Sequence, residues 1–140
     1  MENITENTTA QSPLFESTTD QIRVTVLPQY IPEESNPAHN VFFYSYTVTI
    51  TNESSASVQL LRRSWKITDA LGETRHVDGE GVVGEQPILS PGEDFSYTSF
   101  SPLETPSGSM KGHYTFKSNQ LEEFDVEIPE FFLRDSSLMN

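Results

Sequence analysis

Residues 41–51, VFFYSYTVTIT, alternate between large apolar or aromatic side chains and small polar ones. Successive side chains of an extended strand point to opposite faces, so this alternation places five residues on one face: Phe42, Tyr44, Tyr46, Val48 and Ile50. We expect a half-buried strand whose apolar face lies in the core. This run is the strongest strand signal in the chain and favours a β fold.

The same period of two recurs between clusters of Pro, Gly, Ser and Asn. It predicts further strands at residues 22–26, 58–68, 74–77, 95–100, 113–117 and 124–132. Adjacent Leu60 and Leu61 cannot both face one side of a regular strand, which predicts a bulge there. Pro129 places the last strand at an edge or near its end. About seven such strands predict an all-β fold, an antiparallel β-sandwich rather than a barrel.

The chain has 140 residues, is 34% hydrophobic and contains no cysteine, which fits one domain. Residues 1–19 are rich in Thr, Asn, Glu and Ser and lack a periodic apolar face, so we expect a disordered N-terminal tail. The β-sandwich is expected over residues 20–134 and a flexible C-terminus over residues 135–140. The absence of cysteine excludes disulfides, thiolate zinc sites and thiol catalysis.

Eight Lys and Arg residues against 21 Asp and Glu residues give a formal net charge of −13. Such a field repels nucleic acids and anionic lipids, so we expect neither as a partner. No apolar run is long enough to span a membrane, and no signal peptide is recognisable. These features predict a cytoplasmic protein without membrane insertion.

One segment, Gly79-Glu80-Gly81-Val82-Val83-Gly84, matches the G-x-G-x-x-G pattern of dinucleotide-binding folds. That mechanism needs a helix directly after the glycines, and Pro87 and Pro91 rule one out. Two interpretations remain open. The glycines serve a wide turn or a close approach of strands, or their N–H groups form an anion-binding nest beside a basic segment. A pyrophosphate or nucleotide site of the second kind would use Gly79, Gly81, Gly84, Arg62, Arg63 and Arg75.

The same region also offers ligands for a divalent cation. Carboxylates suit Mg²⁺, and Co²⁺ accepts an imidazole as well, so the candidate ligands are His76, Asp78 and Glu80. The alternative is that these are ordinary solvated charges of an acidic surface, and no other cofactor is expected. No G-x-S-x-G elbow or triad pattern is present, so we do not expect an enzyme.

Large apolar side chains indicate where a protein partner could bind. Trp65 is expected in the core, whereas one of the adjacent Phe131 and Phe132 should face solvent and could anchor a partner. Edge strands of sandwiches pair easily, which makes a homodimer a further expectation.

Several blocks of the sequence resemble the ApaG family. They are residues 58–65 (VQLLRRSW), 79–87 (GEGVVGEQP), 89–92 (LSPG), 95–99 (FSYTS) and 128–131 (IPEF), within a match that runs from residue 22 to residue 133. Two positions differ from the family's usual residues. Ser64 stands where a histidine is usual, and Phe100 stands where a glycine is usual, so we expect a locally different turn or an extra apolar contact at Phe100.

The resemblance implies an immunoglobulin-like or fibronectin type III-like β-sandwich in a small cytoplasmic bacterial protein without an established activity. It also implies links to cobalt resistance and magnesium handling, and to protein binding through related domains in eukaryotic F-box and polymerase-interacting proteins. We therefore favour a non-catalytic protein-interaction module that acts on Co²⁺ or Mg²⁺ homeostasis through a partner. A pyrophosphate or nucleotide binder at the glycine loop and a direct metal binder are the alternatives.

Overall fold

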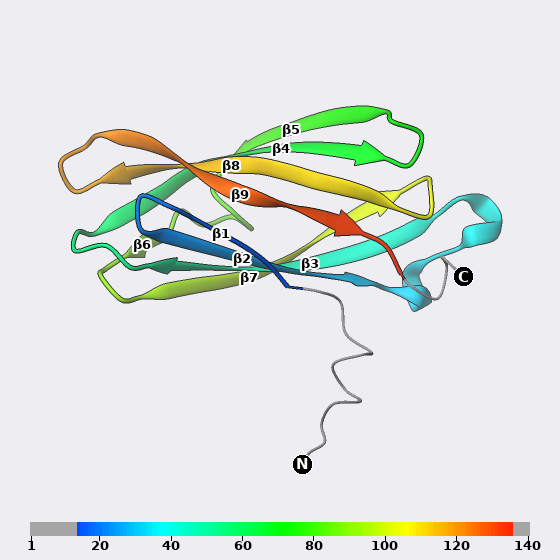
Figure 1. Ribbon diagram of the computed structural model, residues 1–140, viewed down its shortest axis with the longest axis horizontal. Coiled ribbons are helices and arrows are strands. Elements are labelled where there is room, and N and C mark those ends of the chain that lie inside the picture. The colour runs from blue at the N-terminus through cyan, green and yellow to red at the C-terminus, as the bar shows by residue number, and fades with distance from the viewer. Residues whose placement is uncertain (1–13, 136–140) are drawn as a thin grey trace, which may run out of the picture.

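Two antiparallel sheets lie face to face in the computed structural model, which describes residues 14–135 (Figure 1). The described residues form strands and two single-turn 3₁₀ helices, in this order: β1 (Phe15–Thr19), β2 (Ile22–Tyr30), η1 (Pro32–Glu34), η2 (Pro37–His39), β3 (Phe42–Asn52), β4 (Val58–Asp69), β5 (Thr74–Glu80), β6 (Ile88–Leu89), β7 (Asp94–Leu103), β8 (Gly108–Ser118) and β9 (Glu123–Leu133).

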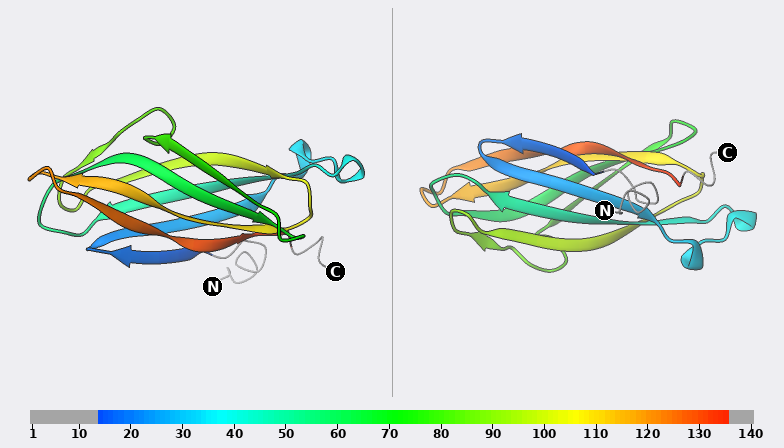
Figure 2. Two further views of the ribbon diagram at one scale, coloured as in Figure 1. Left: turned by 90° about the horizontal axis from the view of Figure 1, so that it is seen from above. Right: turned by 60° about the horizontal axis from the view of Figure 1, so that its bottom comes forward.

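The first sheet has the strand order β1-β2-β3-β7 and the second has the order β5-β4-β8-β9, with the short β6 paired to the start of β4. Figure 2 shows the two layers from two further sides. The prediction of an all-β antiparallel sandwich is confirmed, and the arrangement is compatible with an immunoglobulin-like or fibronectin type III-like fold. Within the described residues, no helix is long and apolar enough to cross a membrane.

The core lies between the sheets and follows the alternation of the sequence. On β3, the five residues predicted to share the apolar face are all buried. Trp65 from the opposite sheet is 3% exposed and packs against the rings of Tyr46, Tyr114 and Phe131, as expected for a core residue. Such aromatic edge-to-face contacts stabilise a core beyond the area that they bury.

The predicted disordered tail is wrong for residues 15–19, which form β1. This strand pairs with β2 through a two-residue turn in which Asp20 and Gln21 both have positive φ. Phe15 packs against Phe131 and Phe132, with ring centroids 6.3 and 5.9 Å apart. A turn with two positive φ values usually has Asn, Asp or Gly followed by Gly, so Asp20 fits but Gln21 stands where glycine is usual, which weakens the sequence signal. Residues 1–13 of the predicted tail and residues 136–140 lie outside the described residues.

Four local predictions are confirmed. The register of β4 against β8 shifts between Leu60 and Arg62, where the bulge was expected. Strand β9, which contains Pro129, is at the edge of its sheet. Phe131 is buried, whereas Phe132 is 45% exposed, and Phe100 makes its extra apolar contact by stacking on Phe43 with a centroid distance of 5.5 Å.

Candidate functional site

The glycine motif begins inside a strand and ends in a tight turn. Gly79 belongs to β5 and lies opposite Arg63 of β4. The chain then turns through Gly81, Val83 and Gly84, all with positive φ. Mutual backbone hydrogen bonds of 2.8 and 2.9 Å between Val82 and Glu85 close this turn. The side chain of Val82 is fully buried, which holds the turn against the sandwich.

The carbonyl groups of this loop hold the guanidinium of Arg63. Its Nη1 donates to the carbonyl oxygens of Glu80, at 3.0 Å, and Gly81, at 2.8 Å. A Cβ on Gly79 would lie only 2.7–2.8 Å from the guanidinium atoms, and a Cβ on Gly81 would lie 2.3 Å from the carbonyl oxygen of Glu85. Gly81 is therefore required for a close approach of the backbone, and Gly79 leaves room for the guanidinium of Arg63. Close approach is one of the two interpretations that the sequence left open.

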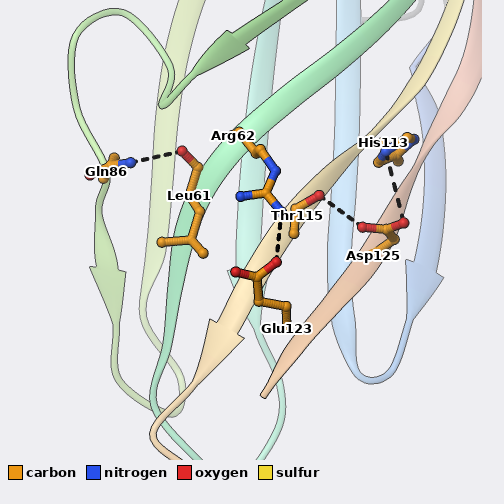
Figure 3. Close-up of polar contacts among 7 residues, drawn as sticks. All are labelled: Leu61, Arg62, Gln86, His113, Thr115, Glu123 and Asp125. Atoms are coloured by element: carbon orange, nitrogen blue, oxygen red, sulfur yellow. Dashed lines mark hydrogen bonds and ion pairs between the residues drawn. The ribbon is translucent and has the colours of Figure 1, made fainter. Parts of the chain in front are cut away.

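The loop also completes the bulge of β4. The carbonyl oxygen of Leu61 accepts the N–H of Gly81 at 2.8 Å. It also accepts the side-chain amide of Gln86 at 2.8 Å (Figure 3). The N–H of Gly81 is thus used inside the fold, and so are those of Val82 and Glu85. The loop turns carbonyl oxygens toward Arg63, whereas an anion nest would need N–H groups in that place.

Of the six residues considered for an anion site, the structure brings together Arg63, Gly79 and Gly81. Arg62 points to the opposite side of β4 and pairs with Glu123 of β9 at 2.6 Å (Figure 3). Arg75 reaches the carbonyl oxygen of Pro102, at 3.4 Å, and Gly84 lies exposed in the turn.

Three buried tyrosines lie near Arg63. The hydroxyl groups of Tyr97 and Tyr114 are hydrogen bonded to each other in the interior. Burial raises the pKa of both phenols, and that of Tyr46, above the ordinary value, and the charge of Arg63 offsets only part of this effect. These groups therefore remain protonated at neutral pH and cannot serve as general bases.

The candidate metal ligands lie in a row along β5. His76, Asp78 and Glu80 are alternate residues of one strand, so they share a face and are spaced about 6–7 Å apart. Opposite them on β4 lie Lys66, Ser64 and Arg62, none of which is a carboxylate or an imidazole. Within residues 14–135, no group of three or more His, Cys, Asp or Glu side chains is placed to hold a metal ion.

A cleft of about 950 Å³ lies at one end of the sandwich, between the β4–β5 hairpin, the end of β7 and the segment around η2. Ile67 lines it from the core, and Val41 and Leu71 line it with 37% and 79% of their surface exposed. Charged and polar residues complete its lining: His39, Asp69, Glu73, Arg75 and Glu104. Sequence reasoning missed this cleft because its walls come from distant segments, and its one local signal is the apolar Leu71 in a polar turn.

The hairpin that forms one wall is held in a fixed shape. The carboxylate of Asp69 accepts the N–H groups of Leu71 and Glu73, at 2.9 and 3.0 Å. The hydroxyl of Thr105 accepts the N–H of Ala70, at 3.0 Å, which ties the hairpin to the segment after β7. The cleft is therefore preformed in the described structure.

Strand β5 continues from the cleft as an open edge. It is the outermost strand of its sheet, and six of its seven residues are exposed (Figure 1). On the other side of the sandwich the edges of β1 and β9 meet, because Ser17 donates to the carbonyl oxygen of Glu127 and Thr19 accepts its N–H. The outer edges of β5 and β7 remain unpaired among the described strands, and residues of both strands line the cleft.

These features define a small β-sandwich protein with an open strand edge and a preformed cleft at one end. The family model described as "ApaG domain" matches residues 32–118, so the chain belongs to the ApaG family. Protein ApaG of Methylocella silvestris is 53% identical over 120 residues, which cover 86% of this chain and 92% of that protein. Protein ApaG of Rhodopseudomonas palustris is 49% identical over the same shares.

Solved structures agree with this assignment. The crystal structure of an ApaA protein from Bordetella pertussis is 43% identical and has a TM-score of 0.79, covering 89% of this chain and 96% of that one. A second X-ray structure, the structural-genomics target SoR45, is 39% identical with a TM-score of 0.81, covering 89% and 94%. None of these names states a reaction.

Proposed function

We propose that this protein is a non-catalytic interaction module that binds an extended segment of a partner protein along β5 and in the adjoining cleft. The observation that carries the proposal is the exposed apolar pair Val41 and Leu71 in a preformed cleft. Only 34% of the residues are hydrophobic, so most of them are needed for the core. A leucine left exposed in the lining of a cleft is typical of a binding site.

The edge of β5 supplies the second part of the surface. An exposed strand edge offers unpaired backbone donors and acceptors, and a partner strand can add to them while its alternate side chains enter pockets. A segment paired with β5 would run directly into the cleft, because Thr74 and Arg75, the first two residues of β5, also line the cleft.

The charge of the chain favours a particular partner. With a net charge of −13, the protein attracts basic segments at a distance and repels acidic ones. We therefore expect an extended segment with basic residues and one large apolar side chain for the cleft. A role in Co²⁺ or Mg²⁺ homeostasis, which the family resemblance suggests, would be exerted through that partner.

The test uses two leucines at opposite ends of the molecule. Leu71 is in the β4–β5 turn and Leu121, 71% exposed, is in the β8–β9 turn (Figure 1). Random displayed peptides at least as long as β5 are selected on the full chain, and the affinity of the enriched peptides is measured. Leu71→Asp should abolish their binding and Leu121→Asp should leave it unchanged. Enriched peptides that bind equally to both variants, or a library without enrichment, would refute the proposal.

A further inference from the structure

The outer face of the second sheet carries an unusual row of bases. Lys66 of β4 lies directly opposite Lys111 of β8 on one side and opposite His76 of β5 on the other. In the next row, Ser64 lies opposite His113. These residues come from three adjacent strands, and sequence order alone did not group them.

The row lines a depression of about 370 Å³ on this face. Gly112 forms part of its wall and cannot be replaced by a larger residue, since a Cβ would lie 1.9 Å from the carbonyl oxygen of Ser64. Beside it, the register of β8 against β9 shifts between Met110 and Gly112. The bulge brings Glu130 to the rim, where Glu127 also lies. The depression is thus a fixed consequence of the backbone.

Among residues 14–135, no carboxylate lies at ion-pair distance from the two lysines of this depression, although Glu127 and Glu130 are at its rim. Like charges directly opposite each other on neighbouring strands are destabilising. The ion pairs among residues 14–135 use Arg23, Arg62 and His113, and none uses Lys66 or Lys111. In a chain with 21 acidic and eight basic residues, carboxylates to neutralise two adjacent lysines are abundant. Their absence from ion-pair distance points to an external anion.

We propose that this depression binds a small phosphate-bearing anion, either free phosphate or a phosphomonoester. Two ammonium groups and the hydroxyl of Ser64 supply donors for phosphate oxygens, and the imidazole rings of His76 and His113 lie in the same depression. Glu127 and Glu130 at the rim repel extended polyanions and accept hydrogen bonds from hydroxyl groups of a phosphomonoester. The site is separate from the cleft and from the glycine loop.

The test is an amide NMR titration of the labelled full chain with inorganic phosphate and, in a second arm, with glycerol phosphate, each at constant ionic strength. We expect saturable shifts at Lys66, His76, Lys111 and Gly112. Tighter binding of glycerol phosphate would assign a phosphomonoester, and equal or weaker binding would assign free phosphate. Spectra without saturable shifts in both arms, or shifts centred on Gly79–Gly84, would overturn the proposal.

Matched variants distinguish binding at a specific site from nonspecific electrostatic attraction. Lys66→Met and Lys111→Met should each weaken binding about tenfold, the loss expected for one charged contact. Lys117→Met changes the same net charge on the same strand, but Lys117 lies opposite Glu123, so it should have almost no effect. Without phosphate, the first two variants should melt about 1–3 °C higher because repulsion is relieved. An equal loss of binding in all three variants would show nonspecific attraction.

Discussion

Replacing Gly79 by alanine tests the contact between the glycine loop and Arg63. The backbone of Gly79 is in an ordinary extended conformation, so alanine is allowed there, but its Cβ would lie 2.7 Å from Nη2 of Arg63. The guanidinium is the mobile end of a long side chain and can swing away. The cost is therefore the loss of its two hydrogen bonds to the carbonyl oxygens of Glu80 and Gly81.

The magnitude follows from the burial of these bonds. A hydrogen bond to a charged group contributes about 1.5–3 kcal/mol when well buried. One of these two bonds is exposed and the other is half-buried, so we assign about 2 kcal/mol to the pair. Alanine in a strand regains about 0.5–1 kcal/mol over glycine. Gly79→Ala should therefore destabilise the protein by about 1–1.5 kcal/mol.

The sign of the effect should reverse when Arg63 is removed. In an Arg63→Met background no guanidinium occupies the space, so Gly79→Ala should stabilise the protein by about 0.5–1 kcal/mol. Gly84→Ala is the matched control. Its φ is +81° and no atom lies within 4 Å of the new Cβ, so it should cost about 1 kcal/mol in both backgrounds.

The assay is urea unfolding of the unmodified protein, the three variants of this cycle and Gly84→Ala in both backgrounds, followed by far-ultraviolet circular dichroism and by the fluorescence of Trp65. Equal costs of Gly79→Ala in the two backgrounds would refute the account, because they would show that the glycine is required for a reason unrelated to Arg63.

Two further predictions concern the second sheet and the buried phenols. Gly112→Ala should destabilise the protein by about 3 kcal/mol or prevent folding, because its Cβ would meet the backbone of β4. The control Gly72→Ala has open space at its Cβ and should cost about 1 kcal/mol. Thermal unfolding of the two variants tests this difference. Burial raises the pKa of Tyr97 and Tyr114 above the unfolded value of 10.0, so the folded protein holds more protons above that pH. Stability should be unaffected by these groups below pH 10 and fall as the pH rises above it. In an alkaline titration the near-ultraviolet absorbance of these phenolates should appear together with unfolding, and their ionisation in a still folded protein would contradict the prediction.

The sequence predicted most of the strands because their signal is local. A side chain on a strand shares its face with the residue two positions away, so the alternation in residues 41–51 reports burial without knowledge of any partner strand. The bulge at Leu60 and Leu61 follows from the same rule. The strand Phe15–Thr19 was missed because its stability depends on rings of Phe131 and Phe132, more than 110 residues away.

For the candidate site residues too, the sequence predicted what depends on nearby residues and missed what depends on distant ones. The sequence placed Arg63 and the glycines together by proximity, and the structure agrees for Gly79 and Gly81. It could not tell that loop carbonyl oxygens would face the guanidinium, because that orientation depends on the positive φ of Gly81 and on the bulge carbonyl of Leu61. Lys111 was not considered, since only the register of β8 against β4 brings it beside Lys66.

The sequence by itself therefore determined the β architecture, the acidic field and the membership in the ApaG family. The tertiary structure decided which strand edges remain open, where the cleft lies and which bases lie side by side. The physical reason is range. Alternation and charge are properties of neighbouring residues, whereas an edge, a cleft and a cross-strand pair are defined by contacts between segments that the sequence keeps far apart.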